Sequence, residues 1–158
     1  MNIIDALLGE HAVFYSLFDQ CEADAQRGGS VSEVRAQAAL LTRPLVAHAR
    51  LEDELLFDRL TGRAGADAAL LTVVRDDHHE IERALGAARS APDLATARDQ
   101  LTVAIAVARA HFAREERALF PLAERLLDVE LLTEMGADWA SRRGVSVTER
   151  AGTVSTAR

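Results

Sequence analysis

Two ten-residue stretches decide the fold: His48–Phe57 has the sequence HARLEDELLF, and His111–Phe120 has the sequence HFAREERALF. The two stretches are identical at the histidine, at the glutamate four residues later, and at the leucine–phenylalanine pair that follows. Histidine and glutamate at this spacing lie one turn apart on the same face of an α-helix. Because the other residues on that face are apolar, the pattern predicts two helices that each turn a polar pair inward.

The repeat extends to the segment that precedes each of these stretches. Glu10-His11 and Asp77-His78 are each followed by an apolar residue three positions after the histidine. The chain is therefore interpreted as two equivalent helical hairpins, each carrying one histidine and then a His-x-x-x-Glu pair. Core packing alone does not require polar residues at matching positions of otherwise apolar stripes.

Apolar residues recur every three or four positions between short glycine- and proline-containing breaks, as in amphipathic helices. The predicted long helices span residues 3–31, 32–61, 66–90 and 93–127. A short fifth helix is predicted at 128–143. The predicted fold class is all-α, an up-down-up-down four-helix bundle with a short C-terminal fifth helix. We expect one domain over 1–143 and a loosely ordered C-terminal tail over 144–158, where the periodicity is lost.

Two prolines fall inside the predicted helices. Pro44 is expected to kink the second helix or to mark a looser start, because proline lacks the backbone N–H of a helical residue. Pro121 is expected to bend or end the fourth helix for the same reason.

Composition excludes several kinds of chemistry and partner. The 158 residues include 25 acidic and 18 basic side chains, so at a net charge of −7 we expect no nucleic-acid partner. All the basic residues are arginine, which excludes a lysine nucleophile or Schiff base. The single Cys21 excludes an internal disulfide, and no apolar run is long enough to cross a membrane. We expect a cytoplasmic protein with no membrane contact.

Inward carboxylates in a helical core are costly unless they are paired or bound to metal. A single His-x-x-x-Glu pair is a common surface contact, but two matching copies with two further histidines are more specific. Mixed histidine and carboxylate ligation suits non-haem iron, manganese or zinc better than calcium or magnesium. The predicted metal ligands are His11, His48, Glu52, His78, His111 and Glu115.

These residues, with the leucine–phenylalanine pairs that follow Glu52 and Glu115, resemble the hemerythrin-like HHE cation-binding family. The resemblance covers about residues 1–143. It implies a helical bundle around two non-haem iron ions, bridged by two carboxylates and an oxygen species. It also implies roles in oxygen carriage or storage, oxygen and redox sensing, iron handling, nitric oxide responses or peroxide removal.

The chain departs from the oxygen-carrying members of this family, which have a fifth histidine four residues after the third-helix ligand. Here that position, four after His78, is Glu82. We leave open whether Glu82 is a further ligand or lies on a solvated face. His79 is about 100° round the helix from His78. We therefore expect its side chain to face solvent or to contact a metal ligand rather than the metal itself.

Two more side chains are candidates for the neighbourhood of the metals. Tyr15 follows His11 by one turn and is expected to pack in the core with its hydroxyl near the site, or to bind iron itself. Glu116 is expected to face water or to accept a hydrogen bond from a ligand imidazole.

The resulting functional hypothesis is a non-haem di-iron protein that binds hydrogen peroxide, O2 or NO. With no histidine four residues after His78, both irons would keep an open position, which favours peroxide decomposition over reversible oxygen carriage. No catalytic residue beyond the metal centre is predicted. The alternatives are an oxygen or redox sensor, an iron storage or buffering module, and a metal-free helical interaction domain.

Overall fold

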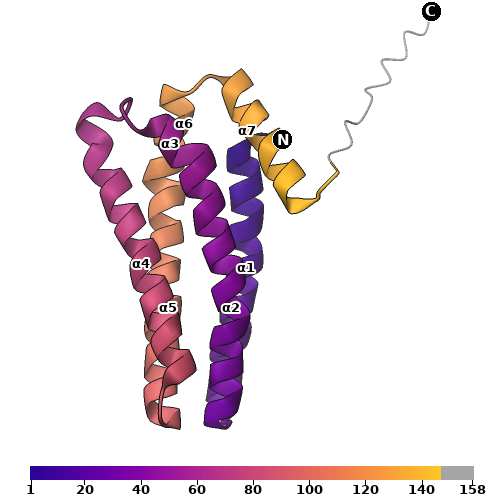
Figure 1. Cartoon of the computed structure of the whole chain (residues 1–158), viewed down its shortest axis with the longest axis vertical. Helices are drawn as coiled ribbons and strands as arrows, with labels where there is room; N and C mark the ends of the chain where they lie inside the picture. Colours follow the sequence, from indigo (N-terminus) through magenta and orange to yellow (C-terminus); the bar gives the residue numbers. More distant parts are fainter. Residues whose placement is uncertain (147–158) are drawn as a thin grey trace, which may run out of the picture.

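A computed structural model describes residues 1–146, and every regular element in that range is helical. The four long helices pack side by side, and a shorter helix, α7 (Val129–Arg143), lies against one end of the bundle beside α1 (Figure 1). The long helices are α1 (Ile3–Gln26), α2 (Val31–Glu52), α4 (Ala68–Ser90) and α5 (Leu94–Arg114). The predicted helical bundle with a C-terminal fifth helix is confirmed, whereas the predicted tail falls mainly outside the described residues.

Short elements extend two of the long helices. A π-helical turn and the short helix α3 (Asp58–Leu60) follow α2, whereas a second π-helical turn and α6 (Phe120–Leu126) follow α5. A 3₁₀ turn, Gly65–Asp67, leads into α4. In Figure 1 the α1–α2 and α4–α5 connections lie at one end of the bundle, and the α3–α4 connection lies at the other. Within residues 1–146, no helix has the length and apolarity needed to span a lipid bilayer.

The predicted first helix over 3–31 is too long, because α1 stops before a glycine pair. Gly28 and Gly29 have φ values of 96° and 138°, a region of backbone conformation that side-chain-bearing residues rarely adopt. Ser30 then begins α2 as its N-cap, since its side chain accepts a hydrogen bond from the Glu33 amide and Glu33 bonds back to Ser30.

The predicted helices at 32–61 and 93–127 are each interrupted by a π-helical turn, Asp53–Phe57 and Glu115–Leu119. Both turns lie where a His-x-x-x-Glu pair ends, and such wider turns occur frequently at functional sites. The expectation that Pro121 ends its helix is wrong, because Pro121 lies in the first turn of α6, where a missing N–H is tolerated. Pro44 lies within α2, which continues past it.

Two apolar clusters fill the bundle, one on either side of a polar layer. The first cluster includes Phe14, Phe18, Leu41, Leu45, Ile81 and Phe112. The second includes Leu7, Leu56, Phe57, Val74, Leu119 and Met135. Along α1 the chain passes from the second cluster at Leu7 to the first at Phe14, with buried His11 between them. The same change of cluster occurs along α2, along α4, and between α5 and the turn that follows it, so the polar layer crosses the whole bundle.

Helix α7 contacts the start of α1 through a glycine. A Cβ atom on Gly136 would lie 2.7 Å from the Met1 carbonyl oxygen and 2.8 Å from the Asn2 carbonyl carbon. Only a residue without a side chain permits this approach of two backbones.

Replacing Gly136 by alanine is expected to lower the free energy of unfolding by about 1–3 kcal/mol, because the added methyl group must displace backbone atoms. The control is Gly86→Ala in α4, where a Cβ would meet no atom within 4 Å. That substitution is expected to raise the same quantity by about 0.5–1 kcal/mol through helix propensity. Denaturant unfolding measures both, and equal effects would contradict the contact between α7 and α1.

Candidate metal centre

Six polar side chains from all four long segments meet in the layer between the two apolar clusters. They are His11 from α1, His48 and Glu52 from α2, His78 from α4, His111 from α5, and Glu115 from the π turn that follows α5. His78 is 10% exposed, and the other five are exposed by 1% or less. These six are the ligands predicted from the sequence, and the structure brings them together.

Glu115 lies at the centre of the group. Its Oε1 is 2.9 Å from Nε2 of His111, and its Oε2 is 3.3 Å from Nε2 of His11. The two carboxylate oxygens therefore face histidines from different helices. This is the arrangement that a carboxylate needs to bridge two metal ions.

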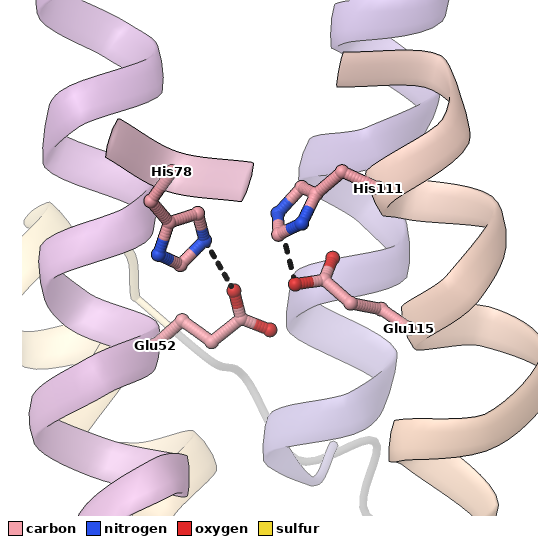
Figure 2. A group of neighbouring side chains, drawn as sticks. All are labelled: Glu52, His78, His111 and Glu115. Atoms are coloured by element: carbon pink, nitrogen blue, oxygen red, sulfur yellow. Dashed lines mark ion pairs between the residues drawn. The ribbon is translucent and has the colours of Figure 1, made fainter. Parts of the chain in front are cut away.

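Glu52 faces Glu115 from the opposite helix, as Figure 2 shows. Its Oε2 is 3.5 Å from Nε2 of His78 and 4.0 Å from Nε2 of His48. Ligand atoms of Glu52, His78, His111 and Glu115 all lie within 4.8 Å of one another, and so do those of His11, His48 and Glu115. The geometry thus contains two metal-sized groups that share Glu115.

The side-chain atoms that face each other in this layer have no hydrogen-bond partner among the described residues. They are Nε2 of His11, His48, His78 and His111 and both carboxylate oxygens of Glu52 and Glu115. Burying so many unpaired polar atoms costs free energy unless a ligand satisfies them. Imidazole nitrogen and carboxylate oxygen are donors that suit iron, manganese and zinc. The residues present therefore fit a metal pair.

Carboxylates from neighbouring helices approach the outer ring nitrogens, Nδ1, of these histidines. Nδ1 of His48 lies 2.6 Å from Oε2 of Glu10, and Nδ1 of His11 lies 2.9 Å from Oε1 of Glu116. An imidazole that donates its Nδ1–H to a carboxylate keeps the lone pair of Nε2 directed into the site.

On the other side of the site two aspartates approach the outer ring nitrogens without forming a hydrogen bond. Nδ1 of His111 is 3.5 Å from Oδ2 of Asp77, and Nδ1 of His78 is 3.9 Å from Oδ2 of Asp53. Each acid comes from a different helical segment than the histidine it faces. Glu116, after α5, faces α1, and Glu10 of α1 faces α2. Asp53, after α2, faces α4, and Asp77 of α4 faces α5. We call these four residues the outer acids. Glu10 and Glu116 hydrogen-bond to an imidazole, whereas Nδ1 of His78 and Nδ1 of His111 have no hydrogen-bond partner among the described residues.

Burial and neighbouring groups shift the pKa of two of the histidines and of both glutamates in this layer. Burial lowers the pKa of His48, and burial together with His111 lowers the pKa of His78 to about 3. Burial and the neighbouring Glu115 raise the pKa of Glu52 well above its ordinary value. For Glu115, burial is outweighed by the imidazoles of His11 and His111, so its pKa is lowered. Neutral imidazoles are the form that binds metal.

The additional candidates from the sequence lie around the two groups rather than in them. Glu116 is an outer acid, and the Tyr15 hydroxyl donates to its Oε1 over 3.2 Å. His79 and Glu82 are exposed and line a pocket next to His78. None of these four belongs to either metal-sized group.

Sequence reasoning missed the roles of Glu10 and Asp77 as outer acids. The signal was present, because an acidic residue directly precedes the histidine in both halves of the repeat. Its meaning depends on the packing of neighbouring helices, since each of these acids supports a histidine on the following helix rather than its own neighbour.

Comparisons with known proteins agree with this geometry. A family model described as the hemerythrin HHE cation binding domain matches residues 2–123, which include all six side chains of the polar layer and end before α7. No curated protein and no solved structure matches the chain significantly. Because the match covers well over half of the sequence, the chain belongs to the hemerythrin HHE cation-binding domain family.

Proposed function

We propose that the chain binds two iron ions in the polar layer of an up-down-up-down bundle and uses them to decompose hydrogen peroxide. The observation that carries the proposal is the set of unpartnered buried atoms, four imidazole nitrogens and four carboxylate oxygens, directed at one another. In a metal-free interaction domain these buried atoms would stay unpaired and would lower the stability of the fold. Membership of a cation-binding family supports the same assignment.

In this proposal each ion has two histidines. His78 and His111 hold one ion, His11 and His48 hold the other, and Glu52 and Glu115 lie between them. The assignment is supported by the two oxygens of Glu115, which face His111 and His11 separately. Glu52 has the corresponding position relative to His78 and His48.

A pocket of about 360 Å³ between α2 and α4 supports access of a small molecule to the site. His48, His78 and His111 line its inner end, and His79 and Glu82 are exposed residues of its lining. Apolar residues such as Leu45 and Ile81 complete the walls and limit the water near the ligands.

Bound iron would supply a reversible two-electron change, which peroxide disproportionation to water and O2 requires, with no external reductant. The chain's own contribution would be to direct Nε2 of the four histidines inward and to leave a coordination position on each ion open to peroxide. Glu82, where oxygen carriers would have a further histidine, is exposed and outside both metal-sized groups. Reversible oxygen carriage is therefore the less favoured use of this site.

Removing metal from the purified protein should lower its melting temperature. A ligand present at about a thousand times its dissociation constant stabilises the native state by about 4 kcal/mol, which corresponds to roughly 10 °C for a chain of this size. Thermal melts before chelation, after chelation and after reloading with iron measure the effect. A melting temperature that stays constant through this cycle would count against an internal metal site.

Replacing Glu115 by glutamine should reduce bound iron from two ions per chain to at most one, because the carboxylate common to both groups loses its charge. The matched control is Glu116→Gln on the adjacent residue, which should keep two ions while weakening affinity by about 10–100-fold through the loss of support for His11. Elemental analysis gives the stoichiometry. Equal iron content in both variants would mean that the wrong carboxylate was chosen.

The iron-loaded protein should release O2 from hydrogen peroxide, measured with an oxygen electrode. Glu115→Gln protein, incubated with the same iron, should be no faster than free iron in buffer. The reduced protein should also be exposed to oxygen and monitored by absorption. A long-lived, reversible oxygen adduct with no peroxide turnover would overturn this proposal in favour of oxygen carriage.

A further inference from the structure

Each outer acid is itself held by another side chain, and the source of that side chain differs among the four. Asp53 accepts a hydrogen bond from Arg75 of α4, and Asp77 accepts one from Arg114 of α5. Glu116 accepts one from a tyrosine of α1. For these three, the supporting group belongs to the four-helix bundle itself.

Glu10 is held from outside the four-helix bundle, by α7. Its Oε1 accepts hydrogen bonds from Trp139 Nε1 over 3.1 Å and from Arg143 Nε over 2.7 Å. Its Oε2 accepts from Arg143 Nη2 over 3.1 Å and lies 2.6 Å from Nδ1 of His48. Both oxygens of this carboxylate are therefore occupied, one by α7 alone and the other by α7 and a histidine of the metal centre.

These contacts fix a side chain that would otherwise be free to rotate. A glutamate has several rotatable bonds, and ordering it costs entropy. The two-point contact with the Arg143 guanidinium sets the plane of the carboxylate as well as its position. A fixed anion at Nδ1 orients the imidazole and increases its basicity.

We propose that α7 is a positioning element of the metal centre, in which Trp139 and Arg143 hold Glu10 so that His48 presents Nε2 to the ion it shares with His11. The inference rests on the proposed metal pair. It assigns a role to a helix that begins after the family match ends. It also makes the two metal positions unequal, because the ion at His78 and His111 has no support from α7.

The test compares single substitutions on α7 by anaerobic titration with ferrous iron against a competing chelator. Arg143→Ala and Trp139→Phe remove donors to Glu10, whereas Glu10→Gln removes the anion itself. The matched control is Arg142→Ala, because Arg142 is the neighbouring arginine of the same helix and its ion pair is with Glu54, which bonds to Arg50 and to no histidine.

Wild-type and Arg142→Ala proteins should bind two ions with the same affinities. Glu10→Gln should bind one ion as tightly as wild type and the second about 10–100-fold more weakly. Arg143→Ala and Trp139→Phe should weaken the same single ion and leave the other unchanged. If both bind their two ions as tightly as Arg142→Ala, α7 does not position the site.

A second readout needs no metal. In ¹⁵N NMR spectra of the metal-free protein, His48 should hold its proton on Nδ1 in wild type and in Arg142→Ala. In Arg143→Ala and Trp139→Phe it should populate both tautomers. An unchanged tautomer in these two variants would overturn the inference while leaving the metal centre intact. Failure of wild type to bind iron would instead overturn the metal centre and the inference with it.

Discussion

Glu52 and Glu115 are buried carboxylates that face one another, and the rest of the site depends on how their negative charge is compensated. Moving one anion into a protein interior costs several kcal/mol, and the second also repels the first. Burial and Glu115 raise the pKa of Glu52, whereas for Glu115 burial is outweighed by the imidazoles of His11 and His111, which lower its pKa. A pair of cations would neutralise this charge and would pair the Nε2 and carboxylate oxygen atoms that have no hydrogen-bond partner among the described residues.

The outer acids add a second constraint, because they place four more carboxylates around an already anionic centre. Arginines of the bundle and of α7 offset this charge, as at Asp53, Asp77 and Glu10. A guanidinium always stays charged and donates several hydrogen bonds in one plane, so it fixes a carboxylate more firmly than an ammonium group does. The absence of lysine from the sequence is consistent with this role of the basic side chains, since all of them are arginine.

The sequence was informative where periodicity and spacing determine structure. It predicted the bundle and the six residues of the polar layer, because a helix translates a four-residue spacing directly into a shared face. It placed the end of α1 too late, since the positive φ angles of Gly28 and Gly29 and the cap at Ser30 are local features that periodicity does not reveal. The π turns and the contact between Glu10 and His48 were not predicted, because packing between helices determines such features.

Two apolar clusters, one on each side of the polar layer, determine how metal and fold depend on each other. Each cluster contains residues from α1, α2 and α4 together with α5 or the turn that follows it, so the helices are held at both ends of the site without help from an ion. In small domains with one metal and little core, the protein folds only when metal binds. Here the two apolar clusters hold the helices, and Glu10 and Glu116 hydrogen-bond to the imidazoles of His48 and His11. The free energy of metal binding can therefore act on the charge of two carboxylates rather than on the folding of the chain.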